Sequence, residues 1–277
     1  MFPSSAMGLP ASLKFDLPPS MSESSRSYSV NVAPDGITVV NGPTDAISFT
    51  ANAAVQKPFT SQMVSFTIPS GMSDSVFLDP TKTTLSFTLL YTVGTAASVT
   101  GGVVQMLSSA ASWFDQLVLV SNNTPIETIN NYGLLQNFML QNTVNQSERS
   151  GGISIAMGAD SNSASGIDLA NATTGTYRYN FCIPLMSVIG VNTDNKLFPI
   201  GSVNNLQLQM TTASLTPIVS YCTASATNVV LSAVSLSEFR INMCYVDVGD
   251  AAAQMLRSTL QDGKWYLKST TYTNSSV

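Results

Sequence analysis

Apolar and polar residues alternate along several stretches of the chain, which is the pattern of β-strands that bury one face. In residues 63–71 (MVSFTIPSG) every second residue of the run is apolar, and Pro69-Ser70-Gly71 ends the run as a turn signal. Residues 75–94 predict a short strand followed by a long one, with Asp79-Pro80 interpreted as a turn between them. The core face of these strands is expected to carry Val64, Phe66, Ile68, Leu85, Phe87, Leu89, Tyr91 and Val93.

The alternation continues in the second half of the chain. Residues 112–129 predict two strands joined by a turn at Asn122-Asn123-Thr124-Pro125. In residues 206–210 (LQLQM) the two glutamines are expected outside and the other three residues in the core. Further strands are predicted at 176–185, 197–201, 217–223, 226–236, 238–248 and 263–273. About nine or ten strands with few helices predict a sandwich or a barrel.

Two segments have the spacing of helices. Residues 132–144 (YGLLQNFMLQNTV) place four apolar residues at helical spacing, and this stripe is expected to close a barrel end or cover a sheet corner. The four residues are Leu134, Leu135, Phe138 and Met139. Residues 249–260 predict a second, short helix with Asp250 placed to cap it.

These patterns divide the chain into three parts. Residues 1–44 are rich in Ser, Pro and Gly with little periodicity, and they predict an extended N-terminal arm. Residues 45–248 contain the strands of the barrel, and residues 249–277 are expected to form a helix-and-strand linker segment. Inside the barrel part, residues 145–175 predict a long polar loop, and excursions of that length are usually functional or mobile.

Charge is scarce in this composition. Only 10% of the residues are charged and 44% are hydrophobic, whereas soluble domains carry about 25% charged residues. Because charged groups are depleted from interface cores, this composition favours a surface covered by neighbouring subunits over a secreted β protein with a Ser/Thr-rich exterior. The net charge of −5 and the absence of a Lys/Arg run in the first 45 residues argue against general nucleic-acid binding.

The sequence offers little catalytic chemistry. It contains no histidine, which removes Ser-His-Asp and Cys-His arrangements and His-ligated zinc. No phosphate-binding loop or EF-hand motif occurs. The acidic residues are scattered singly: Asp74 and Asp79 flank a strand, and Glu127 sits beside Ile126. Asp79-Pro80 is interpreted as a turn signal and Asp247 to Asp250 as a helix start. We therefore predict no enzymatic activity, no catalytic, cofactor-binding or metal-binding residues and no cofactor.

Three other residues are candidates for a binding role. Arg149 either binds a carboxylate on a neighbour or is a solvated loop charge, and the sequence favours neither. Trp113 and Trp265 are interpreted as packing anchors, although a lectin would also use exposed tryptophans for stacking on sugars.

Four segments of the chain resemble the N-terminal jelly roll of the double jelly-roll major capsid proteins of adenovirus-like, giant-virus, virophage and tailless-phage particles. The likeness covers roughly residues 60–270 and is a pattern of spacings. The segments that carry it are 64–93, 112–149, 181–214 and 238–259. The resemblance implies an all-β fold, an antiparallel eight-stranded jelly-roll sandwich with one or two short helices. A second jelly roll follows in that family, whereas the strands predicted here account for one.

The resemblance also implies a function. The protein would be a structural viral capsid protein in the virion, synthesised in the cytoplasm or nucleus of the host cell. Its partners would be copies of itself, as a trimer or larger capsomer of an icosahedral shell, and other capsid or membrane proteins. Residues 145–175 would form a tower or inter-capsomer loop, and the N-terminal arm would contact neighbours or an inner membrane. The alternative from another class is a carbohydrate-binding β-sandwich or adhesin.

Overall fold

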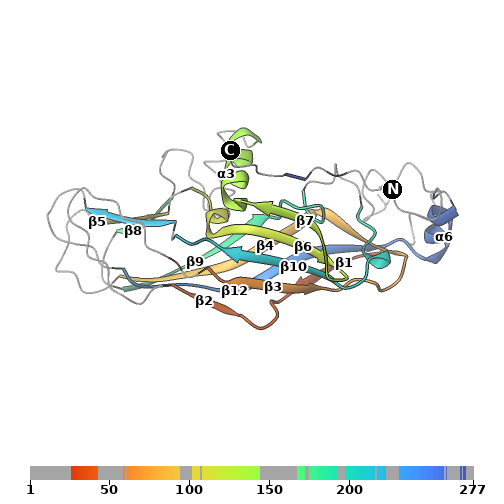
Figure 1. The fold of residues 1–277 in the computed structure, drawn as a ribbon, viewed down its shortest axis with the longest axis horizontal. Helices are drawn as coiled ribbons and strands as arrows, with labels where there is room; N and C mark the ends of the chain where they lie inside the picture. The colour runs from red at the N-terminus through yellow and green to blue at the C-terminus, as the bar shows by residue number, and fades with distance from the viewer. Residues whose placement is uncertain are drawn as a thin grey trace, which may run out of the picture.

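The structure is a computed structural model in which two antiparallel sheets face each other across an apolar core (Figure 1). A third, smaller sheet lies beyond one end of this sandwich, and the C-terminal helix α6 lies at the opposite end (Figure 1). The structure describes residues 26–42, 59, 61–93, 102–106, 108–143, 167–171, 175–191, 197–215, 217–222, 231–258, 260, 269, 271 and 272.

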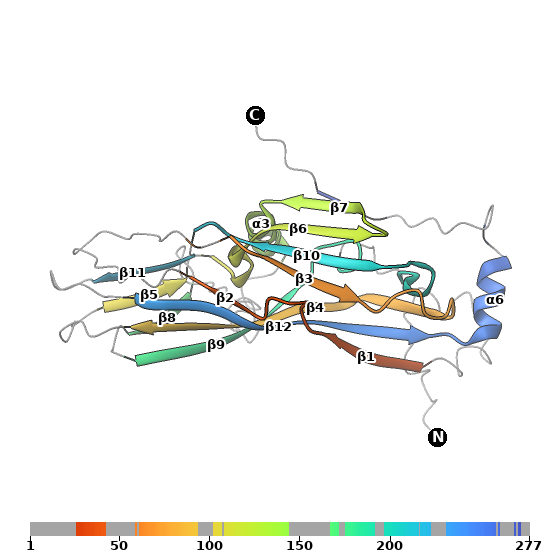
Figure 2. The same cartoon turned by 60° about the horizontal axis from the view of Figure 1, so that its bottom comes forward.

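The two large sheets have the strand order of a jelly roll. One sheet runs in the order β1 (Arg26–Val32), β12 (Leu231–Asp247), β4 (Val76–Val93) and β9 (Gly175–Pro184), with β2 (Val39–Asn41) also paired to β12. The other runs in the order β3 (Met63–Ile68), β10 (Leu206–Thr212), β6 (Phe114–Ser121) and β7 (Thr124–Asn130). Figure 2 shows them as two layers.

Leaving β2 aside, the eight strands numbered along the chain have the orders 1-8-3-6 and 2-7-4-5 in the two sheets. This exchange of successive strands between two sheets is the double Greek key of a jelly roll. The predicted fold class, an antiparallel jelly-roll sandwich with two short helices, is confirmed.

The inner faces of both sheets carry the alternating apolar residues that the sequence predicted. Val64, Phe66 and Ile68 of β3 are buried, and β10 buries every second residue from Leu206 to Thr212. The centre of the core is aromatic, since the ring of Phe87 lies 5.3 to 6.1 Å from three other phenylalanine rings. These rings belong to Phe114, Phe181 and Phe239. Strands from both sheets therefore meet around Phe87.

The small sheet is assembled from three insertions into the jelly roll. It contains β11 (Ile218–Cys222), β5 (Gly102–Met106) and β8 (Ile167–Asn171), in that order. These strands lie in the connections from β10 to β12, from β4 to β6 and from β7 to β9 respectively. Figure 2 shows β5, β8 and β11 together at one end of the barrel. The predicted polar loop 145–175 therefore contains a strand, β8, that pairs with β5.

The prediction of an extended arm over residues 1–44 is wrong for its last part. β1 pairs along its whole length with β12, from Arg26 opposite Asp247 to Val32 opposite Ile241. It is the first strand of the jelly roll, so the barrel begins well before residue 45. Most β1 side chains are exposed, and the strand lies at the edge of the sheet. Tyr28, Val30 and Val32 alternate with polar residues, so a short strand signal was present within the Ser-rich segment.

The two helices lie where the sequence placed them. α3 spans Tyr132–Thr143 and α6 spans Asp250–Ser258, and short 3₁₀ turns occur at η1 (Ala110–Trp113) and η2 (Ile200–Ser202). Asp250, the predicted cap, is the first residue of α6. Just before the helix, the carboxylate of Asp247 accepts a hydrogen bond of 3.0 Å from the backbone N–H of Gly249. The predicted strand 263–273 lies almost wholly outside the described residues, so the extent of the linker segment stays a prediction.

The segments around Pro80 and Pro125 have a different structure from the turns predicted for them. Asp79-Pro80 lies inside the continuous strand β4, where Asp79 pairs with Cys244 and Thr84 with Asn242. Four residues of β4 thus face one of β12, and this bulge accommodates a proline that has no N–H to donate. Asp79 accepts hydrogen bonds from the backbone and hydroxyl of Thr81, so the expected turn became a local bend.

The hairpin between β6 and β7 is tighter than predicted. Asn122 and Asn123 both have positive φ, at 48° and 61°, which is the conformation of a two-residue hairpin turn. Thr124 and Pro125 already belong to β7, where proline is tolerated because β7 is an edge strand of its sheet.

Candidate interaction surfaces

An open hollow with a volume of about 310 Å³ lies between the start of α3 and the segment that follows β10. Its walls carry the side chains of Leu134 and Asn137 from α3 and of Leu215 from the segment after β10. The remaining lining residues are Ser108, Ser112, Phe114, Asp115, Asn131, Gly133, Ala213, Ser214 and Pro217. Asp115 is the one charged residue among them. The lining of the hollow therefore mixes apolar and polar side chains.

Hydrogen bonds hold one wall of this hollow in place. The Oδ1 atom of Asn137 accepts from the backbone N–H of Ser109 at 3.0 Å and from its hydroxyl, and its Nδ2 atom donates to the hydroxyl of Ser112 at 2.9 Å. Gly133 permits this approach, because a Cβ atom there would lie 2.6 Å from the carbonyl oxygen of Ala111. The helix α3 and the 3₁₀ turn before β6 are thus held together as one preformed surface.

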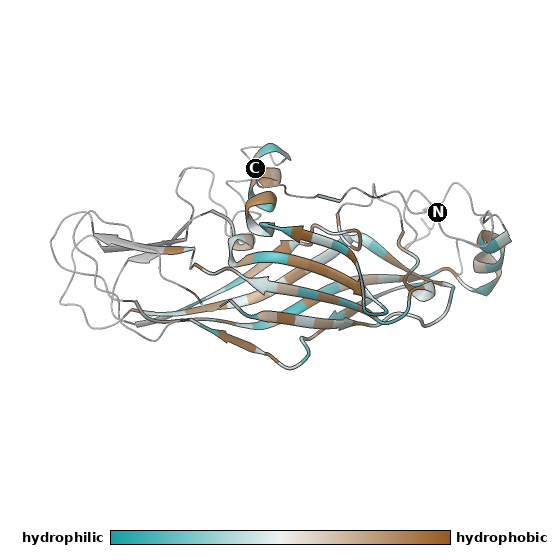
Figure 3. Ribbon diagram, viewed as in Figure 1, coloured by the Kyte–Doolittle hydropathy of each residue, from teal (hydrophilic) through white to brown (hydrophobic). Residues whose placement is uncertain are grey.

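The apolar stripe of α3 is divided between the core and the surface. Leu135 and Met139 pack against the core, as predicted. Leu134 and Phe138 do not, and their exposed fractions of 70% and 62% exceed those of every other large apolar residue described. The prediction that the whole stripe covers the barrel is therefore wrong. Figure 3 shows these apolar bands on a helix that projects from the sandwich.

The geometry of a helix explains this division. Successive residues are about 100° apart around the axis, so Leu134 and Phe138 form one pair and Leu135 and Met139 another, on adjacent faces. The core can take only one of these faces. The buried face also carries Gln136, whose Nε2 donates 3.0 Å to the carbonyl oxygen of Pro184. A signal of the exposed pair was present in the sequence, as an apolar stripe too broad for one contact face.

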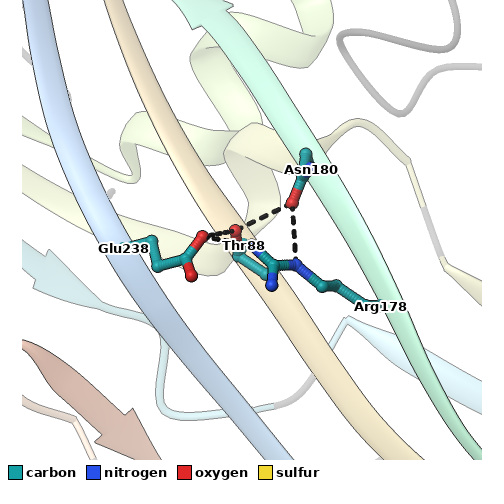
Figure 4. A network of polar contacts seen from close by, with 4 residues as sticks. All are labelled: Thr88, Arg178, Asn180 and Glu238. Atoms are coloured by element: carbon teal, nitrogen blue, oxygen red, sulfur yellow. Dashed lines mark hydrogen bonds and ion pairs between the residues drawn. The ribbon is translucent and has the colours of Figure 1, made fainter.

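The outer face of the β1-containing sheet carries a four-residue polar network (Figure 4). Arg178 of β9 and Glu238 of β12 form an ion pair of 2.5 Å above β4, each with 54% of its side chain exposed. Beneath the pair, the hydroxyl of Thr88 lies 2.8 Å from both Glu238 and Asn180. Its single proton serves one acceptor at a time. This network joins three strands on the outside of the barrel.

Glu127, one of the scattered acidic residues of the sequence, is buried, with 4% of its surface exposed. Its Oε2 atom accepts from the hydroxyl of Ser187 at 2.5 Å and from the backbone N–H of Val188 at 3.0 Å. Burial raises the pKa of Glu127 above its ordinary value, and these two hydrogen bonds offset part of the rise. Nearby, the hydroxyl of Tyr132 accepts from the backbone N–H of Met186 at 3.1 Å.

The remaining acidic residues singled out in the sequence make structural contacts. Asp74 pairs with Arg257 of α6 and accepts from the hydroxyl of Ser202, so it ties the helix to the barrel. Asp79 is buried and pairs with Lys82 at 3.2 Å. Nothing in the sequence pattern pointed to the Asp74–Arg257 contact, because the partners are far apart along the chain.

Trp113 is fully buried in the 3₁₀ turn and stacks edge-on against Phe59, as a packing anchor. Arg149 and Trp265 lie outside the described residues. Within the part of the chain that the structure describes, no three Cys, Asp or Glu side chains gather as metal ligands. No described helix is both long and apolar enough to cross a membrane.

The class of fold is thus a jelly-roll barrel with an added sheet at one end, and known jelly-roll structures of virus particles are similar to it. The chain matches the PBCV-1 virus capsid with 12% sequence identity and a TM-score of 0.43, covering 83% of this chain and 44% of that one. It matches the Faustovirus major capsid protein with 9% identity and a TM-score of 0.45, covering 85% of this chain and 56% of that one. It matches the Sputnik virophage structure with 12% identity and a TM-score of 0.37, covering 74% of this chain and 49% of that one.

The chain spans about half the length of these solved chains. At this level of identity the likeness concerns the fold alone, and the jelly-roll assignment rests on the strand order of the chain itself. No protein-family model and no curated protein sequence matches the chain.

Proposed function

We propose that this protein is a structural subunit of a viral capsid, in which the jelly roll assembles with copies of itself into capsomers that tile an icosahedral shell. The observation that carries the proposal is the jelly-roll strand order with three separate insertions gathered into one added sheet at one end of the barrel. This arrangement gives the molecule two long sides for lateral packing and one decorated end (Figure 1).

The surface chemistry supports lateral packing. A surface that faces water in a solitary protein is usually rich in charge, whereas interface cores are depleted of it. On the outer face of β9 the side chains alternate with the core residues as Thr176, Arg178, Asn180 and Cys182, and the one charge among them is paired with Glu238. A neutral hydroxyl- and amide-rich face can be buried against a neighbour without leaving unpaired charges in the contact.

Further partners follow from this proposal. The subunit forms trimers or larger capsomers of pseudo-hexagonal outline and resides in the virion. Residues that precede β1 contact neighbouring capsomers, other capsid proteins or an inner membrane. Sequence-specific binding of nucleic acid is not part of the proposed role, in keeping with the net charge of −5.

The state of assembly tests the proposal. The purified chain is examined over a range of concentrations by size-exclusion chromatography with light scattering and by negative-stain electron microscopy. We expect trimers, larger capsomers or closed shells without any added ligand. A chain that stays monomeric at the highest concentration reached contradicts the proposal.

The hollow beside α3 favours a second candidate, a carbohydrate-binding β-sandwich or adhesin. Its walls offer the hydroxyls of Ser108 and Ser112, the amide of Asn131 and the carboxylate of Asp115, which are groups that bind sugar hydroxyls. A glycan array separates the two functions. A monomer that binds a defined sugar, and loses that binding in Asp115→Ala, supports the second candidate.

A further inference from the structure

We propose that Glu127 makes the turn at 185–191 sensitive to pH: its protonated carboxyl group holds residues 187 and 188 against β7, and its carboxylate releases them. The proposal goes beyond the capsid role and does not depend on it. β7 and β9 are edge strands of the two large sheets, and the turn that follows β9 is bound to β7 through Glu127. Release of residues 187 and 188 therefore uncovers the seam between the sheets.

The two halves of this turn are held by different side chains. In the first half, the backbone N–H of Met186 donates 3.1 Å to the hydroxyl of Tyr132 on α3. In the second half, the hydroxyl of Ser187 and the backbone N–H of Val188 both donate to Glu127. A change at Glu127 therefore acts on residues 187 and 188 and leaves the hydrogen bond of Met186 in place.

The site accommodates a neutral carboxyl group better than a carboxylate. Only 4% of the surface of Glu127 is exposed. A carboxylate has two oxygens with about four acceptor positions. Both hydrogen bonds from the turn reach Oε2, whereas Oε1 makes none of ordinary geometry to the described residues. Burying an ionised group that is incompletely hydrogen-bonded costs far more than burying a neutral one.

The helix and the C-terminal residues near Glu127 offer it hydroxyl groups and no counter-charge. α3 has no charged residue and contributes Tyr132, whose pKa burial raises above its ordinary value, so that its phenol stays protonated over the range in which carboxyl groups titrate. Thr271 is exposed and helps to favour the charged form of Glu127 by hydrogen bonding, and Tyr272 packs against the core.

The strands around the turn supply no counter-charge either. The turn itself contains no charged residue. On β6, which pairs with β7, the one charged residue is Asp115, and it is exposed. β4 carries Asp79 and Lys82, which pair with each other at 3.2 Å. β9 carries Arg178, which pairs with Glu238 on the outer face. Glu127 thus has no cation on these elements to stabilise its charge.

Thermodynamic linkage gives the direction of the switch. Burial raises the pKa of Glu127 while the turn is held against β7, whereas a released and hydrated carboxyl group has the ordinary value of 4.5. Protons therefore bind the closed turn more tightly and favour it. The closed turn is fully favoured below pH 4.5. Release increases by up to about tenfold for each pH unit from there to the closed-state pKa, and it is constant above that value.

Hydrogen exchange resolved to single residues by mass spectrometry tests the proposal on the full chain. The protection factor of the Val188 amide is divided by that of the Met186 amide at each pH from about 4 to 8, so that changes shared by the whole barrel cancel. We expect this ratio to fall with pH in wild type by up to about tenfold per pH unit. In Glu127→Gln, which cannot ionise, it should not change with pH. A constant ratio in wild type, or the same fall in the variant, overturns the proposal.

Tyr132→Phe is the matched control, because it removes the acceptor of the Met186 N–H and leaves Glu127 in place. We expect lower protection of Met186 at every pH and an unchanged pH dependence at Val188. Loss of the pH dependence at Val188 in this variant would mean that the turn opens as one unit, and it overturns the division into two halves. The wild-type ratio decides the proposal even if Glu127→Gln fails to fold.

Discussion

The hydroxyl of Ser187 donates a 2.5 Å hydrogen bond to the buried carboxylate of Glu127. This bond joins β7 of one sheet to the turn that follows β9 of the other, across 60 residues of sequence. The backbone N–H of Val188 donates to the same oxygen, so a single carboxylate holds the turn at two points. The carboxylate therefore ties an edge strand of one sheet to the turn that follows an edge strand of the other.

Replacing Ser187 by alanine is expected to lower the free energy of unfolding by about 1–3 kcal/mol, since it leaves the buried carboxyl group of Glu127 without one of its two hydrogen-bond partners. Denaturant unfolding measures the change. Ser235→Ala on β12, where the side chain is only half-buried, serves as the control and should change stability by about 0.5 kcal/mol or less. Equal effects of the two substitutions would contradict the role assigned to Ser187.

Glu127 should make stability depend on pH. Burial raises its pKa in the folded state, so the folded protein holds the proton more tightly than the unfolded chain does. Its contribution to stability is thus fully present below the ordinary pKa of 4.5 and is lost as pH rises through the folded-state value. Each pKa unit corresponds to about 1.4 kcal/mol.

Glu127→Gln removes this titration while keeping an oxygen acceptor for Ser187. We expect the free energy of unfolding of the variant, relative to wild type, to increase from pH 4 to pH 7. Subtracting the free energy of unfolding of wild type from that of the variant at each pH removes the contribution of the other carboxylates, which both proteins share. Parallel stability curves for variant and wild type over this range would show that burial does not perturb Glu127.

Phe87 lies at the centre of the aromatic core and is expected to be its most sensitive position. Phe87→Ala should cost about 3–5 kcal/mol, because it removes a ring packed against phenylalanines of both sheets and leaves a cavity. Leu90 of the same strand is partly exposed, and Leu90→Ala is the control, with an expected cost of about 1 kcal/mol or less. A similar cost at both positions would contradict the core assignment.

Gly190 allows the turn after β9 to close on itself. A Cβ atom at this position would lie 1.8 Å from the carbonyl oxygen of Leu185, which accepts from the backbone N–H of Val191. Gly190→Ala should therefore lower the free energy of unfolding by about 1–3 kcal/mol through overpacking. Gly175→Ala provides the comparison, since the nearest atom there is 3.7 Å away, and a loss as large in this variant would be unexpected.

The Arg178–Glu238 ion pair should contribute little to stability despite its short distance. Both side chains are half exposed, and exposed pairs contribute about 0–1 kcal/mol. Arg178→Gln is thus expected to change the free energy of unfolding by less than about 1 kcal/mol, and the change should shrink as salt is added. A larger, salt-independent loss measured by thermal unfolding would mean that the pair is structural.

Helix α3 was predicted only in part. The positions and the start of the helix followed from its apolar spacing, and the burial of Leu135 and Met139 followed from the same pattern. The exposure of Leu134 and Phe138 did not, because two adjacent apolar faces are equivalent until the barrel selects one. The hollow beside them was invisible for a related reason, since its walls come from three separate parts of the chain.

The sequence alone located most core strands and the way their side chains face, because alternation over five or six residues reports burial locally, but it missed β1 and β8. It also indicated a sandwich assembled from many short strands. Only the tertiary structure decided the strand order, since the pairing of Arg26 with Asp247 joins residues at opposite ends of the barrel sequence. The same applies to Glu127 and to the face of α3, where contacts between distant segments determine which polar group is buried and which apolar group stays exposed.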